Sequence, residues 1–133
     1  MEEFSRTEKL IKKEGIEALQ NSTVAIFGVG GVGGFVVEAL ARAGVGTLHI
    51  IDHDTVSISN LNRQIIATHQ TIDQKKVEVM KERILSINPH CHVLTYDDFF
   101  LPETVDHFPF DEFDYIVDAV DTVTAKIKLV EIA

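Results

Sequence analysis

The stretch TVAIFGVGGVGG at residues 23–34 constrains the fold of this chain more than any other feature. Its first residues are apolar and partly β-branched, which predicts a buried strand, and they run directly into a cluster of glycines. A helical apolar pattern follows at once, so the glycines form a tight turn between a strand and a helix. In nucleotide-binding βαβ units such a turn lets the backbone approach a phosphate chain, whose oxygens face the first N–H groups of the helix. The spacing Gly28-x-Gly30-x-x-Gly33, with Gly31 inside it, therefore predicts a phosphate-binding corner.

Hydrophobic periodicity alternates between helix and strand along the rest of the chain. Helices are expected over residues 4–20, 31–43, 75–88 and from 122 onward, and strands over 23–27, 47–52, 91–96 and 115–119. The apolar residues at helical spacing in the second helix are Val32, Phe35, Val36, Ala39, Leu40 and Ala43, and Gly44 follows as a C-cap. This alternation predicts an α/β, Rossmann-like fold, with a mainly parallel sheet in the strand order 3-2-1-4 and helices on both faces. The last helix is still periodic at Ala133, so we expect a domain that is truncated at its C-terminal end.

Composition excludes several classes of protein. No apolar run approaches the about 20 residues that a membrane span needs, and no basic and apolar leader opens the chain, so we expect a cytoplasmic protein with no membrane partner. The single cysteine, Cys91, excludes an internal disulfide or a multi-cysteine zinc site within these residues, and we expect it to be structural. The net charge of −9 argues against broad nucleic-acid affinity from charge alone, although a local basic groove or a second subunit stays open.

Acidic residues stand where the second strand ends. Asp52, and less well Asp54, occupies the position at which dinucleotide-binding domains place a carboxylate for ribose hydroxyls. Such a carboxylate serves a dehydrogenase and an ATP-using enzyme equally. A structural role for Asp52 as a loop or helix cap stays open.

Two cations separate the dehydrogenase from the ATP-using enzyme. Arg63 lies in a polar, non-periodic loop with no core role to explain it, and Lys76 lies at the start of the third helix, where it can also be a solvated lysine. A triphosphate carries more charge than a dinucleotide's pyrophosphate and needs cations, which also stabilise the leaving pyrophosphate. Asp118 and Asp121 end the fourth strand. A carboxylate there can hold Mg²⁺ against the phosphates, and Asp121 can equally cap the next helix.

These ordered motifs resemble the ThiF/MoeB/HesA superfamily, which includes the enzymes that adenylate ubiquitin-like proteins. The motifs are the glycine turn, Asp52-His53-Asp54, SNLNRQ at 59–64, QKKVE at 74–78 and DAVD at 118–121. The resemblance covers essentially the whole chain. It implies that residues 1–133 are the N-terminal half of an ATP-binding adenylation domain. It implies a homodimer or pseudo-dimer that uses Mg-ATP to adenylate a carboxylate and releases pyrophosphate.

The resemblance also implies a role for each candidate residue. The catalytic residues that it implies are Arg63 and Lys76, which bind the phosphates, and Asp121, which binds the magnesium. Arg6 resembles the N-terminal arginine that reaches the partner subunit's ATP. The residues implied to bind ATP are Arg6, Gly28, Gly30, Gly31, Gly33, Asp52, Asp54, Asn60, Arg63, Gln64 and Lys76.

Within the superfamily, the closer resemblance is to the tRNA threonylcarbamoyladenosine dehydratases. Phe4-x-x-Thr7, VEVMKERI, Ile87-Asn88-Pro89 and DAVDTV carry it. It implies that a tRNA is the substrate, whose threonyl carboxylate is adenylated and then closes into a ring with net loss of water. Nothing in composition or spacing alone indicates tRNA.

Three alternatives stay open. The adenylated substrate can instead be the C-terminus of a ubiquitin-like sulfur carrier, with a sulfur-transfer protein as a further partner. The zinc-binding CxxC pair and the candidate catalytic cysteine that bear on this alternative would lie beyond Ala133. An NAD-dependent oxidoreductase is disfavoured by Arg63 and Lys76 and by the scattered histidines, among which His49 is expected to be a packed or an edge residue of a strand. The last alternative is an inactive nucleotide-binding fragment.

Overall fold

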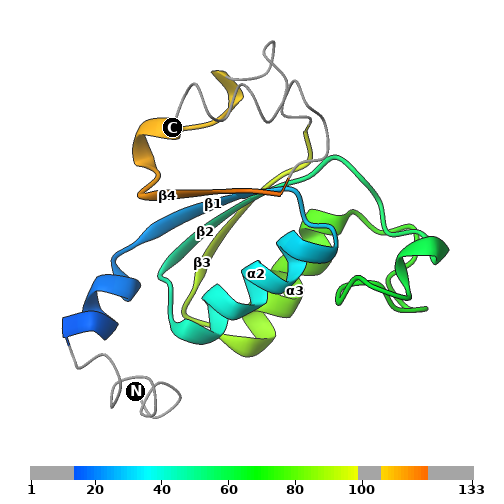
Figure 1. The fold of residues 1–133 in the computed structure, drawn as a ribbon, viewed down its shortest axis with the longest axis horizontal. Helices are drawn as coiled ribbons and strands as arrows, with labels where there is room; N and C mark the ends of the chain where they lie inside the picture. Colours follow the sequence, from blue (N-terminus) through cyan, green and yellow to red (C-terminus); the bar gives the residue numbers. More distant parts are fainter. Residues whose placement is uncertain (1–13, 99–105, 120–133) are drawn as a thin grey trace.

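Four parallel strands form one sheet in the computed structural model, which describes residues 14–98 and 106–119 (Figure 1). The strands are β1 (Thr23–Phe27), β2 (Thr47–Ile51), β3 (His92–Tyr96) and β4 (Tyr115–Asp118). Their order is β3-β2-β1-β4, and all three neighbouring pairs are parallel. The predicted Rossmann-like α/β fold and its strand order are confirmed.

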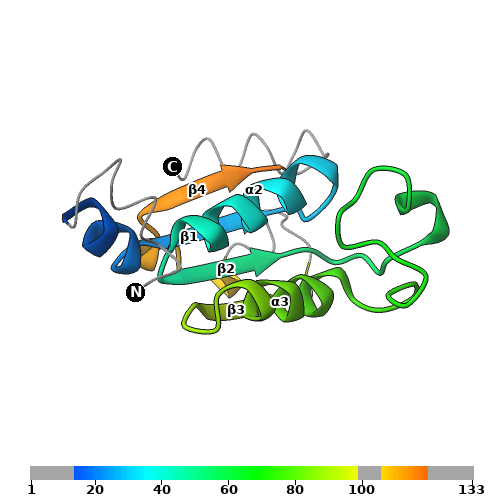
Figure 2. The ribbon, with the colours of Figure 1, turned by 90° about the horizontal axis from the view of Figure 1, so that it is seen from below.

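Two helices cover one face of this sheet (Figures 1 and 2). They are α2 (Gly31–Ala43) and α3 (Lys76–Ile87), and a shorter helical segment over residues 14–20 precedes β1. These bounds agree with the predicted ones within a residue, and Gly44 ends α2 in the left-handed conformation, at φ 97°. The helix predicted from residue 122, and the first part of the one predicted over 4–20, lie outside the described residues. Among the described helices, none has both the length and the apolar character that crossing a membrane requires.

Aliphatic side chains fill the space between the sheet and the two helices. Ile26, Leu48 and Ile50 project from the strands and are fully buried against Met80 and Ile84 of α3. Burying each such side chain contributes about 1.5–3 kcal/mol relative to exposure. This core holds α2 and α3 on the sheet and so places the N-terminal end of each helix near the ends of the strands.

The buried face of α2 differs from the predicted one. Val32 and Phe35 are 73% and 55% exposed, whereas Gly33, Gly34, Val37 and Ala41 are buried. The cause is the contact of the helix with the glycine turn, because a Cβ at Gly33 would lie 1.8 Å from the carbonyl oxygen of Gly28. The helix therefore approaches the turn with its glycine face, and the first two apolar side chains are turned outward.

An aromatic cluster covers the other face of the sheet. Residues 106–114 lie on that side in Figure 1, and Phe108 and Phe110 of this segment pack on Phe27 at ring-centroid distances of 5.5 and 5.6 Å. His49 lies in the same layer, 2% exposed, with its Nδ1 2.9 Å from the hydroxyl oxygen of Tyr96. Of the two positions expected for His49, packed or at a strand edge, the structure shows the packed one. Burial lowers the pKa of this imidazole below its ordinary value of 6.5.

The segment between β2 and α3 extends beyond the ends of the strands toward which the arrows point in Figure 2. It contains the short 3₁₀ helix η2 (Ile58–Asn60) and rejoins the fold through a bridge between Thr55 and Lys75. In open parallel sheets, ligands bind at this carboxyl end. The candidate site residues of this segment are therefore brought to the same end of the sheet as the glycine turn.

Candidate nucleotide-binding site

A cavity of about 350 Å³ lies at the carboxyl end of the sheet. The residues that line it are Gly28, Gly30, Gly31, Val32, Gly33, Asp52, Asp54, Arg63, Gln64, Lys76 and Ala119. Most of the residues predicted to form the site are thus brought together by the fold. Val32 and Ala119 are further lining residues that the sequence reasoning did not assign to a site. Their positions beside the glycines and at the end of the fourth strand were the available signals.

The glycine turn forms one wall of the cavity. Gly28 has φ 101°, a backbone conformation that side chains disfavour, and its N–H donates to the carbonyl oxygen of Ile51 at 2.8 Å. Gly30 then caps α2, with no side chain on the N-terminal end of the helix. The N–H groups of the first helical turn are therefore open to the cavity, which favours an anionic ligand there.

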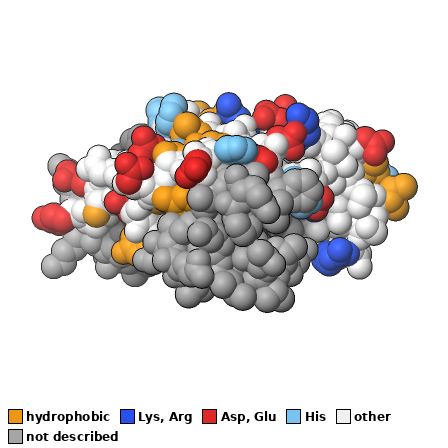
Figure 3. All heavy atoms as spheres, turned by 90° about the horizontal axis from the view of Figure 1, so that it is seen from above, with side chains coloured by type: hydrophobic (Ala, Val, Ile, Leu, Met, Phe, Trp, Pro, Cys, Tyr) orange, Lys and Arg blue, Asp and Glu red, His pale blue; other side chains and the backbone are white. Residues whose placement is uncertain are grey.

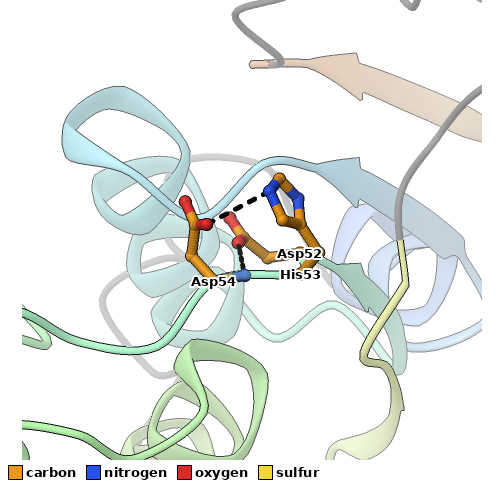
Figure 4. A group of neighbouring side chains, drawn as sticks. All are labelled: Asp52, His53 and Asp54. Atoms are coloured by element: carbon orange, nitrogen blue, oxygen red, sulfur yellow. Dashed lines mark hydrogen bonds and ion pairs between the residues drawn. The ribbon is translucent and has the colours of Figure 1, made fainter.

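Asp52 links the end of β2 to this turn. Its Oδ2 accepts a hydrogen bond from the backbone N–H of Val29 at 2.8 Å. Its Oδ1 accepts one from the backbone N–H of Asp54, also at 2.8 Å (Figure 4). The two bonds fix the carboxylate at the cavity wall. Each carboxylate oxygen has a second lone pair, so a ribose hydroxyl can still donate to it. Both the capping role and the ligand-binding role considered for Asp52 are compatible with this geometry.

Asp54 lies beside Asp52, with its Oδ1 3.1 Å from Nε2 of His53 (Figure 4). Ligand atoms of Asp52, His53 and Asp54 lie within 4.8 Å of one another, as in some metal sites. However, both oxygens of Asp52 already accept backbone N–H bonds, and the ammonium of Lys76 lies 3.8 Å from Asp54 Oδ2. A neighbouring cation opposes a second one, so these residues fit a polar ligand better than a resident metal ion.

Lys76 is the first residue of α3 and is 5% exposed. Its backbone N–H donates to the carbonyl oxygen of Asp54 at 3.0 Å, which fixes its position, whereas its Nζ lies 3.8 Å from Asp54 Oδ2. That separation is too long for a hydrogen bond. The neighbouring Lys75 differs, because it is exposed and its Nζ lies 2.8 Å from Asp97 Oδ2. The solvated-lysine alternative therefore describes Lys75, whereas Lys76 is a buried ammonium facing the cavity.

Arg63 supplies a second cation in the cavity lining. Its guanidinium donates to the backbone oxygen of Ser59 at 2.8 Å and to Oδ1 of Asn62 at 3.1 Å, and both acceptors are neutral. Within residues 14–98 and 106–119, no carboxylate forms an ion pair with Arg63. The lining therefore combines two carboxylates, Asp52 and Asp54, with two cations, Arg63 and Lys76. Such a lining suits a ligand that carries both hydroxyls and anionic groups.

The remaining predicted residues fall into different places. Gln64 lines the cavity, whereas Asn60 lies outside its lining. The Oδ1 of Asn60 accepts hydrogen bonds from the backbone N–H and the hydroxyl of Ser57 at 2.9 and 3.1 Å. Asn60 thus shapes the loop that carries Arg63 in this structure. Arg6 and Asp121 lie outside the described residues.

Cys91 is remote from this chemistry. It is 4% exposed, and burial raises the pKa of its thiol to about 11. A thiol with that pKa stays protonated at neutral pH, and the thiolate is the nucleophilic form. The expectation that Cys91 is structural agrees with this environment.

Known proteins are similar to this chain in sequence and in fold. The ThiF family model matches residues 4–133. The tRNA threonylcarbamoyladenosine dehydratase of Bacillus subtilis (strain 168) is 50% identical over 131 residues, which are 98% of this chain and 52% of that protein. The molybdopterin-synthase adenylyltransferase of Escherichia coli (strain K12) is 39% identical over 120 residues, 87% of this chain and 46% of that protein.

A solved structure gives the same result in three dimensions. The E. coli tRNA N6-threonylcarbamoyladenosine dehydratase, TcdA, in complex with ATP, has a TM-score of 0.94 at 38% sequence identity, covering 97% of this chain and 53% of that one. The chain spans about half the length of these relatives. The family match extends over nearly all of the chain, and the sheet order and glycine turn agree with the fold that the resemblance implied. The chain belongs to the ThiF family.

Proposed function

We propose that this chain is the nucleotide-binding part of an ATP-dependent enzyme that adenylates a carboxylate, and that the carboxylate is that of threonylcarbamoyladenosine in tRNA. The observation that carries the ATP part is the buried Lys76 side chain, which lines the cavity and whose nearest carboxylate oxygen among the described residues is 3.8 Å away. A buried cation needs an anion, and the phosphates of ATP provide one. The tRNA part is supported by the names of relatives that cover nearly the whole chain.

The cavity supports one orientation of the nucleotide. We place the ribose hydroxyls at the carboxylate of Asp52, whose position two backbone N–H groups fix. The phosphate chain then follows the glycine turn to Arg63 and Lys76. In this orientation the helix N-terminus and both cations act on the charge that develops as pyrophosphate leaves.

The proposed reaction has two steps. In the first, an oxygen of the threonyl carboxylate forms a bond to the α-phosphorus of ATP while the bond from that phosphorus to the bridging oxygen breaks, and pyrophosphate leaves. No general base is needed, because the carboxylate is already ionised at neutral pH. In the second step the carbamoyl nitrogen or oxygen bonds to the acyl carbon, AMP leaves, and the carbamoyl group loses a proton. The sum is the loss of one water from the nucleoside.

Magnesium belongs to the proposal as part of Mg-ATP. It would neutralise phosphate charge, and the resemblance assigns its binding to Asp121.

The face of the molecule drawn in Figure 3 gives no separate support for tRNA binding. The Lys and Arg side chains of the described residues on this face lie apart from one another and form no basic patch. Phosphate-backbone binding relies on clustered cations. The tRNA substrate in this proposal therefore rests on the relatives.

The test uses the full-length protein that contains this chain, Mg-ATP and tRNA that carries threonylcarbamoyladenosine. The tRNA is digested afterwards and its nucleosides are analysed by mass spectrometry. We expect an ATP-dependent loss of one water from this nucleoside, and a rate reduced about a hundredfold or more by Arg63→Ala, because one charge-stabilising group is removed. An unchanged nucleoside would exclude the tRNA substrate.

A ubiquitin-like sulfur carrier is the second candidate substrate. The 39% identity to a molybdopterin-synthase adenylyltransferase supports it, because that name describes adenylyl transfer. Exchange of labelled pyrophosphate into ATP, dependent on a carrier protein and not on tRNA, would establish this alternative. In that case a sulfur-transfer protein would be a further partner.

We also propose that the enzyme is a homodimer in the cytoplasm, where tRNA is modified. The exposed Val32 and Phe35 on α2 support an interface beside the cavity, because large apolar side chains are more often buried. Light scattering on the purified full chain should give twice the mass of one chain. A monomeric mass at working concentration would contradict the dimer.

A further inference from the structure

One polar side chain in the cavity wall lacks a hydrogen-bond partner. Gln64 is 7% exposed, and its Oε1 is buried without a donor among the residues that the structure describes. Buried side-chain oxygens are nearly always paired, because leaving one unpaired costs stability. Because Gln64 lines the cavity, a small turn of its side chain would let a bound ligand supply the missing donor.

The backbone holds Gln64 firmly in this place. Its N–H donates to the carbonyl oxygen of Asn60 at 2.9 Å, and its carbonyl oxygen accepts from the N–H of Ala67 at 3.0 Å. Its side chain lies against the glycine turn, because a Cβ at Gly30 would be 3.8 Å from Nε2. The amide therefore lies at the phosphate end of the cavity, next to Arg63.

The phosphates of ATP cannot satisfy this oxygen, because they carry acceptors and no N–H group. The acyl substrate can. In threonylcarbamoyladenosine, and equally at a peptide C-terminus, the carbon that bears the carboxylate also bears an N–H. A primary amide presents one acceptor and two donors close together, so it can accept from that N–H and donate to a carboxylate oxygen at the same time.

We infer that Gln64 binds the acyl substrate rather than ATP, and that its amide selects N-acylated α-amino acid carboxylates through their N–H and one carboxylate oxygen. This inference rests on the proposed adenylation and deepens it. A neutral donor suits this task because a cation bound to the carboxylate would withdraw charge from the attacking oxygen. The two cations of the site are thereby left to the phosphates.

The test compares Gln64→Met with Gln74→Met in the full chain. Gln74 is a matched control, because its exposed amide already donates to the carbonyl oxygen of Gln70 at 3.0 Å. For Gln64→Met we expect the KM for tRNA carrying threonylcarbamoyladenosine to rise at least about tenfold, with unchanged ATP affinity by calorimetry. The thermal midpoint of the ligand-free variant should equal or exceed that of the wild type, because an unpaired buried amide is removed.

A second variant tests the donor half of the contact. Gln64→Glu keeps an acceptor but replaces the NH₂ group with a negative oxygen, so it should raise this KM more than Gln64→Met does. Wild-type KM in both variants, or a loss of ATP affinity in Gln64→Met without a change of KM, would overturn the inference and leave adenylation intact. If the wild type turns over neither this tRNA nor a carrier protein, the proposed function and the inference both fail.

Discussion

His49 and Lys76 are both buried basic side chains, but their surroundings differ. His49 is 2% exposed on the aromatic face of the sheet, and its Nδ1 lies 2.9 Å from the Tyr96 hydroxyl. Lys76 is 5% exposed at the cavity, and among the described residues its nearest carboxylate oxygen is 3.8 Å away. Nδ1 of His49 has a close polar partner inside the protein, whereas the ammonium of Lys76 has only this longer ion pair with the exposed Asp54 carboxylate within the described part of the chain. This difference separates a side chain that belongs to the core from one whose partner is a ligand.

The same contrast extends to the surroundings of each side chain. Around His49, the rings of Tyr96 and Phe113 pack at centroid distances of 5.7 and 4.8 Å. Around the cavity, Gln64 lacks a donor and Arg63 a carboxylate partner among the residues that the structure describes. Polar groups held in this way cost stability, and proteins retain such groups where function requires them. Four substitutions test how far this contrast holds.

The largest effect should come from adding a side chain to the glycine turn that forms the cavity wall. In Gly33→Ala the new Cβ would meet the Gly28 carbonyl oxygen at 1.8 Å, so the backbone must move, and we expect a loss of at least about 3 kcal/mol of unfolding free energy. Chemical denaturation followed by circular dichroism measures it. Gly34→Ala is the matched control, since its Cβ would lie 3.5 Å from Ile65, and it should stabilise α2 by about 0.5 kcal/mol. Equal stability of the two variants would contradict this account of the turn.

Removing the Lys76 ammonium should weaken ATP binding without lowering the stability of the fold. Lys76→Met keeps most of the side-chain volume, so we expect unchanged or higher stability and about 10- to 100-fold weaker ATP binding. Calorimetric titration with ATP measures the affinity. Lys75→Met, which removes an exposed lysine paired with Asp97, should leave ATP affinity unchanged. Unaltered ATP binding in Lys76→Met would mean that Lys76 belongs to the core, like His49.

Asp52 is an intermediate case, because it lines the cavity and is also satisfied by the backbone. Its two oxygens accept from the N–H groups of Val29 and Asp54 at 2.8 Å, and an asparagine can accept with only one oxygen. We therefore expect Asp52→Asn to lower both the unfolding free energy, by about 1–2 kcal/mol, and the ATP affinity, about tenfold. Denaturation and calorimetry on the same variant check both. A change in only one of the two quantities would assign Asp52 to one region alone.

The smallest effect should come from the core histidine and should appear as a dependence on pH. Burial lowers the pKa of His49 below 6.5, so below that pH the unfolded chain binds a proton that the folded protein does not. The contribution of His49 to stability is therefore complete above pH 6.5 and is lost as the pH falls toward the folded pKa. In His49→Gln this part of the pH dependence should disappear, as urea denaturation at a series of pH values would show. The exposed His90 provides the control variant His90→Gln, which should keep the wild-type dependence, and parallel curves for His49→Gln and wild type would contradict the prediction.

Much of the fold follows from the sequence, because its signals are local. A buried parallel strand has a continuous apolar sequence, and a glycine turn has closely spaced glycines. The bounds of the strands, α2 and α3 were therefore predicted within about a residue, and the strand order was predicted as observed. The buried face of α2 does not coincide with the apolar stripe that its sequence shows. Periodicity identifies an apolar stripe, but the close approach of Gly33 to Gly28 decides which side meets the sheet.

The candidate site likewise has features that the sequence predicted and features that it did not. The glycines, Asp52, Arg63 and Lys76 were identified from residue type and position, because phosphate binding needs flexible backbone and cations. Whether Lys76 is solvated or buried, and whether Asn60 shapes a loop, could not be read from the sequence. The sequence by itself therefore determined the α/β topology and the kinds of groups available. Only the tertiary structure decided which buried polar groups find a partner inside the protein, because burial and pairing depend on segments distant along the chain.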